Sequence, residues 1–478
     1  MQWKGWMAAG ACVALATLAQ TTVADAADKA AILRKMEQLD RQQQAIQQQM
    51  EELRQELGLP APTATPARAG ATGRVEEVER RQDILTDEVR VLKEAMVLPE
   101  KKELKSTYGL GPAASKVYGV NQGLSLGGYG EFNYKEKVGD GAGVSDEFDH
   151  LRLVLYTGYK FNDWIVFNSE IEYEHATTGG GGSVSVEFAT LDFLLHPMAN
   201  LRAGLMLVPM GFLNEIHEPP FFHGNVRPQV EQQIIPSTWR ANGAGLFGEI
   251  APGLEYRTYA ITGLDALDFR SSGIRGGRQN GAFEKAEDWA WVGRLDYSPI
   301  EMVTVGGSAY LGNSGQNQNF LDTGADPDST ADDVIYKPDV FTQIYEAHAQ
   351  FRGYGVELRA LGAFSSLDDA AELSLVANQT IGGQQYGWYA EAAYDVMPLV
   401  LPGTRHYLAP WVRYSQFDTV ADVPSGFADD ESQDREIWEV GLSYKPITQV
   451  IIKADYRNQN SDGGELADEI RLGAGFAF

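Results

Sequence analysis

Cysteine is nearly absent from this chain, whose 478 residues contain only Cys12. Cys12 lies in a stretch with the features of a secretory signal: the basic Lys4, an apolar run over residues 7–19 and an A-x-A cleavage pattern at residues 24–26. We therefore predict a signal peptide over residues 1–26. Its removal leaves no cysteine, which excludes a disulfide scaffold and a thiol enzyme. A lipid-modified Cys12 is the alternative, although the residues before it lack the usual leucine and form too short an apolar core.

Long apolar runs and basic residues are also scarce. After residue 26, no run reaches the roughly 18 apolar residues that a membrane-spanning helix needs. The 39 Lys and Arg residues face 66 Asp and Glu residues, which gives a formal net charge of −27. Because such an acidic chain repels the phosphates of nucleic acids, we expect no nucleic-acid partner. Glycine (51) and tyrosine (21) are plentiful, which is typical of many strands, turns and interfacial aromatics.

Residues 27–105 contain two blocks with the period of a coiled coil, separated by a Pro/Ala/Gly linker at residues 58–74. Apolar residues recur at alternating steps of four and three, and each block has one glutamine in the seam. Such a narrow stripe does not suit a helix of a globular core, so we predict an oligomerisation arm in the periplasm, most simply of a trimer. A dimer, or a helix packed on the chain's own barrel, are the alternatives. The seam residues are Ile32, Met36, Leu39, Gln43, Ile46, Met50, Leu53, Leu57, Val75, Val78, Gln82, Leu85, Val89 and Leu92.

After a connector at residues 106–123, the period changes to two. In residues 166–174, for example, Phe167, Ile171 and Tyr173 alternate with Asn168 and a run of inward glutamates. A soluble β-sandwich also alternates, but it does not normally place charges at successive inner positions of long strands. A water-filled barrel does, with apolar side chains toward lipid and polar side chains toward the lumen.

Sixteen such segments can be counted over residues 124–478, joined by mainly short connections that alternate with long ones. The fold class that we predict is therefore an all-β transmembrane barrel of sixteen antiparallel strands, preceded by the α-helical coiled-coil segment. The chain also ends in Phe478, as outer-membrane barrels often do. We expect a bacterial, Gram-negative outer-membrane protein. The segments are 124–137, 148–161, 164–175, 183–195, 200–209, 239–250, 254–262, 288–297, 302–311, 339–352, 355–364, 384–396, 406–417, 435–445, 449–458 and 467–478.

The third long connection, residues 211–238, contains four prolines together with charges of both signs. A sixteen-stranded barrel is too wide for its wall side chains to fill, and an infolded loop narrows it. The stretches LRAGLMLVPMGFLNEIHEPPFF (201–222) and IIPSTWRANGAGLFGE (234–249) resemble the porins of the phosphate-selective O and P type. The resemblance implies a trimeric sixteen-stranded porin whose third loop folds into the lumen. It covers the barrel from about residue 124 to residue 478.

We expect a water-filled channel for passive uptake of small polar or charged solutes, in contact with outer-membrane lipid and lipopolysaccharide. Phosphate selectivity would need an excess of Lys and Arg along the pore, which the sequence does not show, so an anion- or phosphate-selective channel is the alternative. Inward arginines could also face inward glutamates across the lumen and create a transverse field. The predicted lining residues are Glu215, His217, Glu218, His223, Arg227, Glu231, Arg240, Arg152, Arg202, Arg257, Arg294, Glu170 and Glu172, with Glu174, Arg359, Arg413 and Arg471 on the same faces.

Other chemistries have weaker support. His217, Glu218 and His223 do not have metalloprotease spacing, and the prolines between them forbid the required helix, so we predict no metal site. The acidic loop tips at Asp326, Asp328, Asp332, Asp333, Asp429, Asp430 and Glu431 could take divalent cations, but they lack calcium-loop spacing and otherwise predict solvated loops. No nucleophile elbow is present, so we predict no enzyme and no cofactor. The arm could also anchor the outer membrane to peptidoglycan or to a periplasmic partner.

Overall fold

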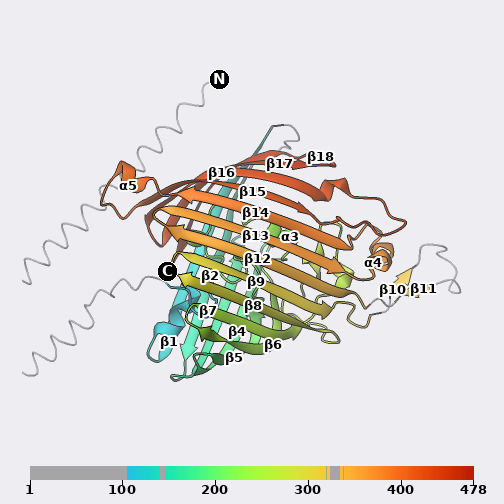
Figure 1. Ribbon diagram of the computed structural model, residues 1–478, viewed down its shortest axis with the longest axis horizontal. Coiled ribbons are helices and arrows are strands. Elements are labelled where there is room, and N and C mark those ends of the chain that lie inside the picture. Colours follow the sequence, from blue (N-terminus) through green and yellow to red (C-terminus); the bar gives the residue numbers. More distant parts are fainter. Residues whose placement is uncertain (1–104, 140–145, 319, 323–333, 337–338) are drawn as a thin grey trace, which may run out of the picture. The chain divides into compact units, whose positions relative to one another are not determined.

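The computed structural model describes residues 105–478, apart from residues 140–145, 319, 323–333 and 337–338 (Figure 1). The predictions of a signal peptide, a coiled-coil arm and an acidic loop tip at residues 326–333 lie outside the described residues. Among the residues that the structure describes, no helix is both long and apolar enough to cross a membrane.

A closed antiparallel β-barrel makes up the described chain (Figure 1). Its sheet has 17 strands, of which β18 (Gly464–Glu465) has only two residues, and the other sixteen form the wall. The barrel closes because β1 pairs with β19, from Tyr129 opposite Ala477 to Val138 opposite Asp468. The wall strands are β1 (Gly123–Val138), β2 (Glu147–Lys160), β3 (Ile165–Glu174), β4 (Ser183–His196), β5 (Ala199–Leu207), β6 (Arg240–Ala251), β7 (Leu254–Thr262), β8 (Trp289–Ile300), β9 (Val303–Asn313), β12 (Phe341–Gly353), β13 (Val356–Leu367), β14 (Gln384–Tyr394), β15 (Tyr407–Asp418), β16 (Asp434–Ile447), β17 (Val450–Ser461) and β19 (Asp468–Ala477).

The predicted fold class is confirmed for the barrel, and each of the sixteen predicted segments corresponds to one wall strand within a few residues. The long connections add small elements that the alternating pattern does not predict. They are η2 (Pro219–Phe221), α3 (Val230–Gln233), η3 (Ala266–Asp268), η4 (Ile274–Gly277), the hairpin β10 (Phe320–Asp322) and β11 (Val334–Tyr336), α4 (Ala370–Ala377) and η5 (Glu431–Gln433). The short helix α5 (Met397–Val400) lies on the opposite, short-turn side.

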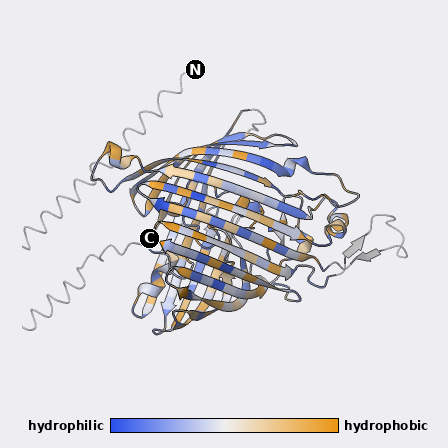
Figure 2. Cartoon of the chain, viewed as in Figure 1, coloured by the Kyte–Doolittle hydropathy of each residue, from blue (hydrophilic) through white to orange (hydrophobic). Residues whose placement is uncertain are grey.

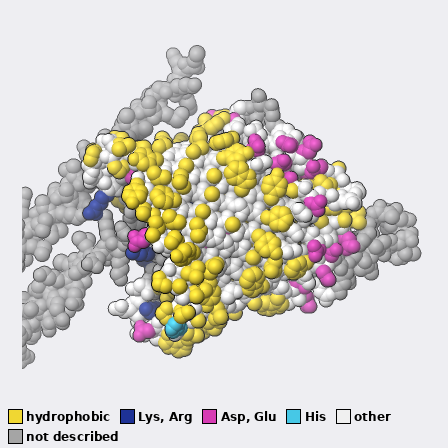
Figure 3. Space-filling view, viewed as in Figure 1, with side chains coloured by type: hydrophobic (Ala, Val, Ile, Leu, Met, Phe, Trp, Pro, Cys, Tyr) yellow, Lys and Arg dark blue, Asp and Glu magenta, His cyan; other side chains and the backbone are white. Residues whose placement is uncertain are grey.

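The two faces of the wall differ in polarity, as the alternation predicts. On β1, Leu124 and Leu126 are 61% and 58% exposed, whereas Ser125 between them is 7% exposed. Orange and blue residues alternate along many of the strands in Figure 2, and Figure 3 shows apolar side chains over much of the visible wall. Acidic side chains gather in Figure 3 toward the end that carries α4. An apolar outer belt of this kind suits contact with lipid.

An apolar core fills part of the lumen on the long-loop side. Residues of the third long loop, such as Val230 and Ile234, pack there with inward wall residues, such as Tyr310 and Tyr389. Leu373 from α4 belongs to the same buried cluster. The barrel therefore encloses folded loops, and any aqueous path through it is narrower than the wall alone would allow.

Candidate functional site

The long loop at residues 211–238 is tied together where it leaves and rejoins the wall. Asn214 Nδ2 donates to the carbonyl oxygens of Val208 (2.6 Å) and Trp239 (2.8 Å), and Asn214 Oδ1 accepts from Trp239 N (2.6 Å). Glu231 Oε2 accepts from Leu213 N at 2.7 Å. Because the two ends of the loop are joined in this way, the residues between them can be held away from the strands that carry them.

The middle of this loop crosses the lumen and reaches the opposite wall. Gly224 O accepts from Lys453 Nζ on β17 at 2.8 Å, and Asn225 N donates to Asp455 Oδ2 on the same strand at 2.9 Å. The turn η2 contacts β19, β1 and β17, whereas the loop itself begins after β5 and ends before β6. The predicted infolding of this loop is therefore seen in the structure.

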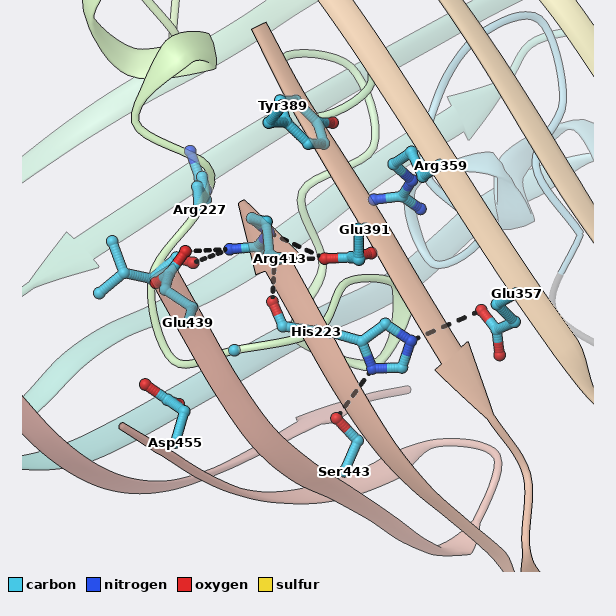
Figure 4. A network of polar contacts seen from close by, with 12 residues as sticks. His223, Arg227, Glu357, Arg359, Tyr389, Glu391, Arg413, Glu439, Ser443 and Asp455 are labelled. Atoms are coloured by element: carbon cyan, nitrogen blue, oxygen red, sulfur yellow. Dashed lines mark hydrogen bonds and ion pairs between the residues drawn. The ribbon is translucent and has the colours of Figure 1, made fainter. Parts of the chain in front are cut away.

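Arg413 on β15 is the main anchor of the loop on that wall (Figure 4). Its side chain is fully buried and contacts Glu391 at 2.5 Å and Glu439 at 2.9 Å. The same guanidinium donates to the carbonyl oxygens of His223 (2.7 Å) and Val226 (3.4 Å) on the loop. A buried arginine with two carboxylates and two carbonyls has most of its donors satisfied, which is the condition under which a buried ion pair is tolerated.

His223 fixes the tip of the loop beside this anchor (Figure 4). Its Nδ1 lies 2.9 Å from Ser443 Oγ, and its Nε2 lies 3.7 Å from Glu357. The imidazole stacks on the ring of Trp411 at 5.9 Å between centroids. The two ring nitrogens thus contact two different strands, β13 and β16, which orients the ring.

A row of alternating charges runs along the wall at the level of Arg413. Strand register places Arg359 opposite Glu391, Glu391 opposite Arg413, and Arg413 opposite Glu439. The row continues from Glu439 to Arg457, which lie 4.0 Å apart, and then to Glu469 on β19. Because each charge of this row has an opposite charge on a neighbouring strand, the net charge of the row is small.

The wall strands β2 to β5, which precede the loop and are called the near wall below, repeat this local pairing. Arg152 contacts Glu131 at 2.9 Å and Glu172 at 3.0 Å, and Arg202 contacts Asp192 at 2.8 Å. We expected inward arginines and inward glutamates to face one another across the lumen. The structure instead places Arg152 and Glu172 side by side on adjacent strands, because a buried guanidinium needs a carboxylate within direct reach.

His217, near the start of the loop, lies between two wall glutamates. Its Nε2 is 3.2 Å from Glu170 Oε1 on β3 and 3.8 Å from Glu187 Oε2 on β4, and its Nδ1 is 3.1 Å from Asn214 O. Arg240 contacts the other oxygen of Glu187 at 2.8 Å. Burial, with a smaller effect of neighbouring arginines, lowers the pKa of His217 to about 4. The imidazole is therefore neutral at pH 7.

The segment before β1 also lies inside the barrel, although the sequence predicted only a connector there. It contains the 3-10 helix η1 (Ala114–Gly119), and Ala114 O accepts from the inward Asn168 of β3 at 2.9 Å. Glu218 of the long loop accepts from Ala113 N (2.9 Å) and Ala114 N (3.4 Å). Burial raises the pKa of Glu218 to about 8, against the opposing effect of these two backbone N–H groups. Two infolded segments therefore contact each other in the lumen.

A cavity of about 460 Å³ remains between these segments and the wall. It is lined by Ser106 and Tyr108 of the N-terminal segment, by Gly253 of the short turn between β6 and β7, and by Ser298 near the end of β8, which places it at the short-turn end. Its charged lining consists of four arginines and three carboxylates: Arg257, Arg294, Arg352, Arg359, Glu215, Glu255 and Asp296. This polar, concave surface is the best candidate for solute contact among the described residues.

Comparison with known proteins shows to which family the chain belongs. No family model matches the chain. A protein of Aquifex aeolicus (strain VF5), described as an uncharacterized protein, is 35% identical over 382 residues, and the match covers 77% of this chain and 82% of the Aquifex protein. The chain belongs to the family of this Aquifex protein. Since that description names no activity, the site must be interpreted from its own geometry.

Solved structures that are similar to the present chain include a loop-deletion mutant of OmpT, an outer membrane protein of Vibrio cholerae, at 12% identity and a TM-score of 0.49. The match covers 75% of this chain and 100% of that one. The anion-selective porin from Comamonas acidovorans matches at 12% identity and a TM-score of 0.46, over 74% of this chain and 99% of that one. Similarity at this level assigns no function, and the resemblance to the phosphate-selective O and P type stays a prediction.

In the present chain, the lining residues predicted from the sequence lie inside the barrel. The wall members are buried or nearly so. Six of them make ion pairs there, namely Arg152, Arg202, Arg240, Arg257, Arg294 and Glu172, and Glu170 contacts His217. The loop members are buried too, namely Glu215, His217, Glu218, His223, Arg227 and Glu231. Two of them serve the fold of the loop itself: Glu215 lies 3.6 Å from Arg257, and Glu231 accepts from Tyr389. Their part in conduction stays a prediction.

Several important residues were missed. Glu187, Asp192 and Asp296 are the carboxylates that neutralise predicted arginines, and His348 joins Asp296 at 2.9 Å. Asp192, Asp296 and His348 occupy inward positions of their strands, so alternation could have placed them in the lumen. Glu187 lies at a β-bulge of β4, where the register shifts and the alternation breaks, so alternation alone does not place it. No sequence pattern predicted that η1 lies inside the barrel, because a short 3-10 helix has no alternation that would show on which side of the wall it lies.

Proposed function

We propose that this protein is an outer-membrane channel for the passive uptake of small polar or charged solutes, constricted by the loop at residues 211–238. The apolar outer belt, the sixteen-stranded closed wall and the charged interior support this function together. An enzyme would need a reactive group aimed at a substrate, whereas the charged groups at the centre of this barrel are bound to one another.

The observation that carries the proposal is the loop itself. It crosses a polar lumen and is fastened to the far wall by Arg413, Lys453 and Asp455. A loop held at both ends leaves a fixed aperture, and the charged cavity of about 460 Å³ lies beside it. A solute that enters this space meets both signs of charge, which favours small polar and zwitterionic molecules over one class of ion.

The test is the conductance of the purified full-length protein in planar lipid bilayers. We expect discrete channels of low conductance, since folded segments fill much of the lumen, and a reversal potential near zero in a potassium chloride gradient. Loosening the loop with Arg413→Met should increase current noise, whereas Arg435→Gln, at a partly exposed arginine near the start of β16, should not. Absence of any channel activity from correctly folded protein would refute the proposed function.

An anion-selective channel is the second candidate, and one feature of the cavity favours it. Arg359 is 8% exposed, donates to Phe221 O at 3.4 Å and to Gln350 Oε1 at 3.2 Å, and has a buried Nη1 without a partner. No carboxylate of a described residue lies within ion-pair distance of it. A free guanidinium donor suits a passing anion. Strong anion selectivity, with phosphate block of chloride current that Arg359→Gln removes, would select this candidate over the first.

The coiled-coil arm supports a proposal about assembly. We propose two roles for residues 27–105. They assemble the chain into a homo-oligomer, most simply a trimer, and they anchor it to peptidoglycan or to a periplasmic partner. Deleting these residues while keeping the signal peptide would separate the roles from conduction. Intact conductance with loss of trimers on native gels would assign assembly to the arm, and unchanged oligomers would exclude it.

A further inference from the structure

Three ligand-type side chains from three separate segments meet inside the barrel. Glu170 of β3, Glu187 of β4 and His217 of the infolded loop each offer one ligand atom, and these atoms lie within 4.8 Å of one another. The three residues are 0%, 1% and 1% exposed. Their positions in the sequence are far apart, so only the infolding of the loop brings the imidazole to the two carboxylates.

The hydrogen-bond pattern leaves this cluster incomplete. A backbone carbonyl can only accept, so the 3.1 Å contact to Asn214 O assigns the proton of His217 to Nδ1. The lone pair of Nε2 then points toward Glu170 and Glu187, which offer only further lone pairs when ionised. Glu170 Oε2 and Glu187 Oε2 are buried and have no hydrogen-bond partner among the described residues. Burial of unpaired carboxylate oxygens beside a lone pair is unfavourable unless a cation lies among them.

The distances suit a metal ion. With metal–ligand distances of about 2.1 Å, the edge of a tetrahedron is about 3.4 Å. Nε2 of His217 lies 3.2 Å from Glu170 Oε1 and 3.8 Å from Glu187 Oε2, on either side of that length. We propose that Glu170, Glu187 and His217 form a binding site for a divalent transition-metal ion of the zinc class. This departs from the sequence-based prediction of no metal site, which concerned the spacing of His217, Glu218 and His223.

The residues around the cluster resemble the outer partners of a metal site. A ligating histidine commonly donates its other ring N–H to a carbonyl, as His217 does to Asn214. The outer oxygen of Glu187 is held by Arg240 at 2.8 Å, which leaves Oε2 free to bind. The donor set selects the metal class, because an imidazole with two carboxylates suits zinc and its neighbours, whereas calcium and magnesium prefer oxygen ligands and water.

The metal would fasten the loop to the near wall. Arg413 already holds the far part of the loop, and a bound ion at His217 would hold the part that follows Asn214. Zinc binding should therefore raise the melting temperature of the barrel, because an ion that binds only the folded state stabilises it. Three protein ligands leave a fourth position for water.

The test uses the full-length protein without a polyhistidine tag, freed of metal by a chelator in detergent and titrated with Zn²⁺ by calorimetry. We expect one ion per chain and a visible absorption band of tetrahedral geometry with Co²⁺. The variant His217→Asn keeps a donor near Asn214 O but removes Nε2. It should weaken binding by more than about 100-fold, since loss of even an outer partner costs about 10–100-fold in affinity. Glu187→Gln should also weaken binding.

The matched control is His406→Asn, which changes an exposed histidine before β15 and should keep one tight Zn²⁺ per chain. Absence of zinc binding by the wild-type protein would overturn the proposal in favour of a shared proton between His217 and Glu170. Equal binding by wild-type protein and His217→Asn would also overturn it, because the ion would then lie elsewhere. If the variants fail to fold, the Co²⁺ band of the wild-type protein decides: a tetrahedral band supports the site and its absence refutes it.

Discussion

Replacing Arg413 with methionine should strongly destabilise the barrel. Methionine has a similar length but no charge, so the change removes the cation and keeps most of the side-chain volume. The loss leaves buried carboxylates on both sides of residue 413, Glu391 on β14 and Glu439 on β16, at 6% and 3% exposure. Glu439 keeps Arg457 at 4.0 Å, but Glu391 loses the only described cation within ion-pair distance.

The expected magnitude follows from this uncompensated charge. Removing one partner of a buried ion pair costs about 3–5 kcal/mol, since the remaining charge stays in a poorly solvated site. Arg413 also donates to the loop carbonyls of His223 and Val226, which lose these donors. We therefore expect the upper part of this range for Arg413→Met, with looser attachment of the loop.

Urea unfolding of the protein in detergent micelles, followed by tryptophan fluorescence, would measure this loss. The triple variant Arg413→Met, Glu391→Gln, Glu439→Gln removes the charges together and should recover most of the stability. Arg435→Gln changes a partly exposed arginine of β16 whose side chain, within the described part of the chain, donates only to Ser432 O, and the change should have little effect. A loss below about 1 kcal/mol for Arg413→Met, which is the range of exposed pairs, would refute the reasoning.

Three further changes test other parts of the structure. Burial raises the pKa of Glu231 in the loop, so its contribution to stability should be present at low pH and be lost as pH rises through the raised pKa. Glu231→Gln should therefore flatten this part of a curve of unfolding free energy against pH. An unchanged curve would contradict the raised pKa of Glu231. Val440→Arg on the outer face should cost about 2–4 kcal/mol of stability in lipid, whereas Phe283→Arg in an exposed loop should not, and equal effects would argue against a lipid-facing wall. Gly475→Ala would place a Cβ atom against Pro219 Cβ, too close for the two atoms to fit without a shift. The change should therefore destabilise the protein by about 1–3 kcal/mol in the same urea assay. A neutral result would show that η2 does not lie tightly on β19.

The sequence by itself determined the wall and the position of the loop. Alternation with a period of two is a local property, because successive side chains of a strand point to opposite faces whatever the neighbouring strands are. Sixteen segments could therefore be placed within a few residues, and strand counting put residues 211–238 on the long-loop side. The inward direction of Arg152, Glu170 and Arg413 followed from the same rule.

The tertiary structure alone decided which of these inward charges meet. Glu391, Arg413 and Glu439 form a row because the register of β14, β15 and β16 puts them opposite one another. Connections of many residues separate these strands, so spacing in the sequence does not fix the register. The same limit explains why the sequence missed both the infolded segment before β1 and the cluster of His217 with Glu170 and Glu187: contacts of a loop with distant strands depend on how the whole barrel closes.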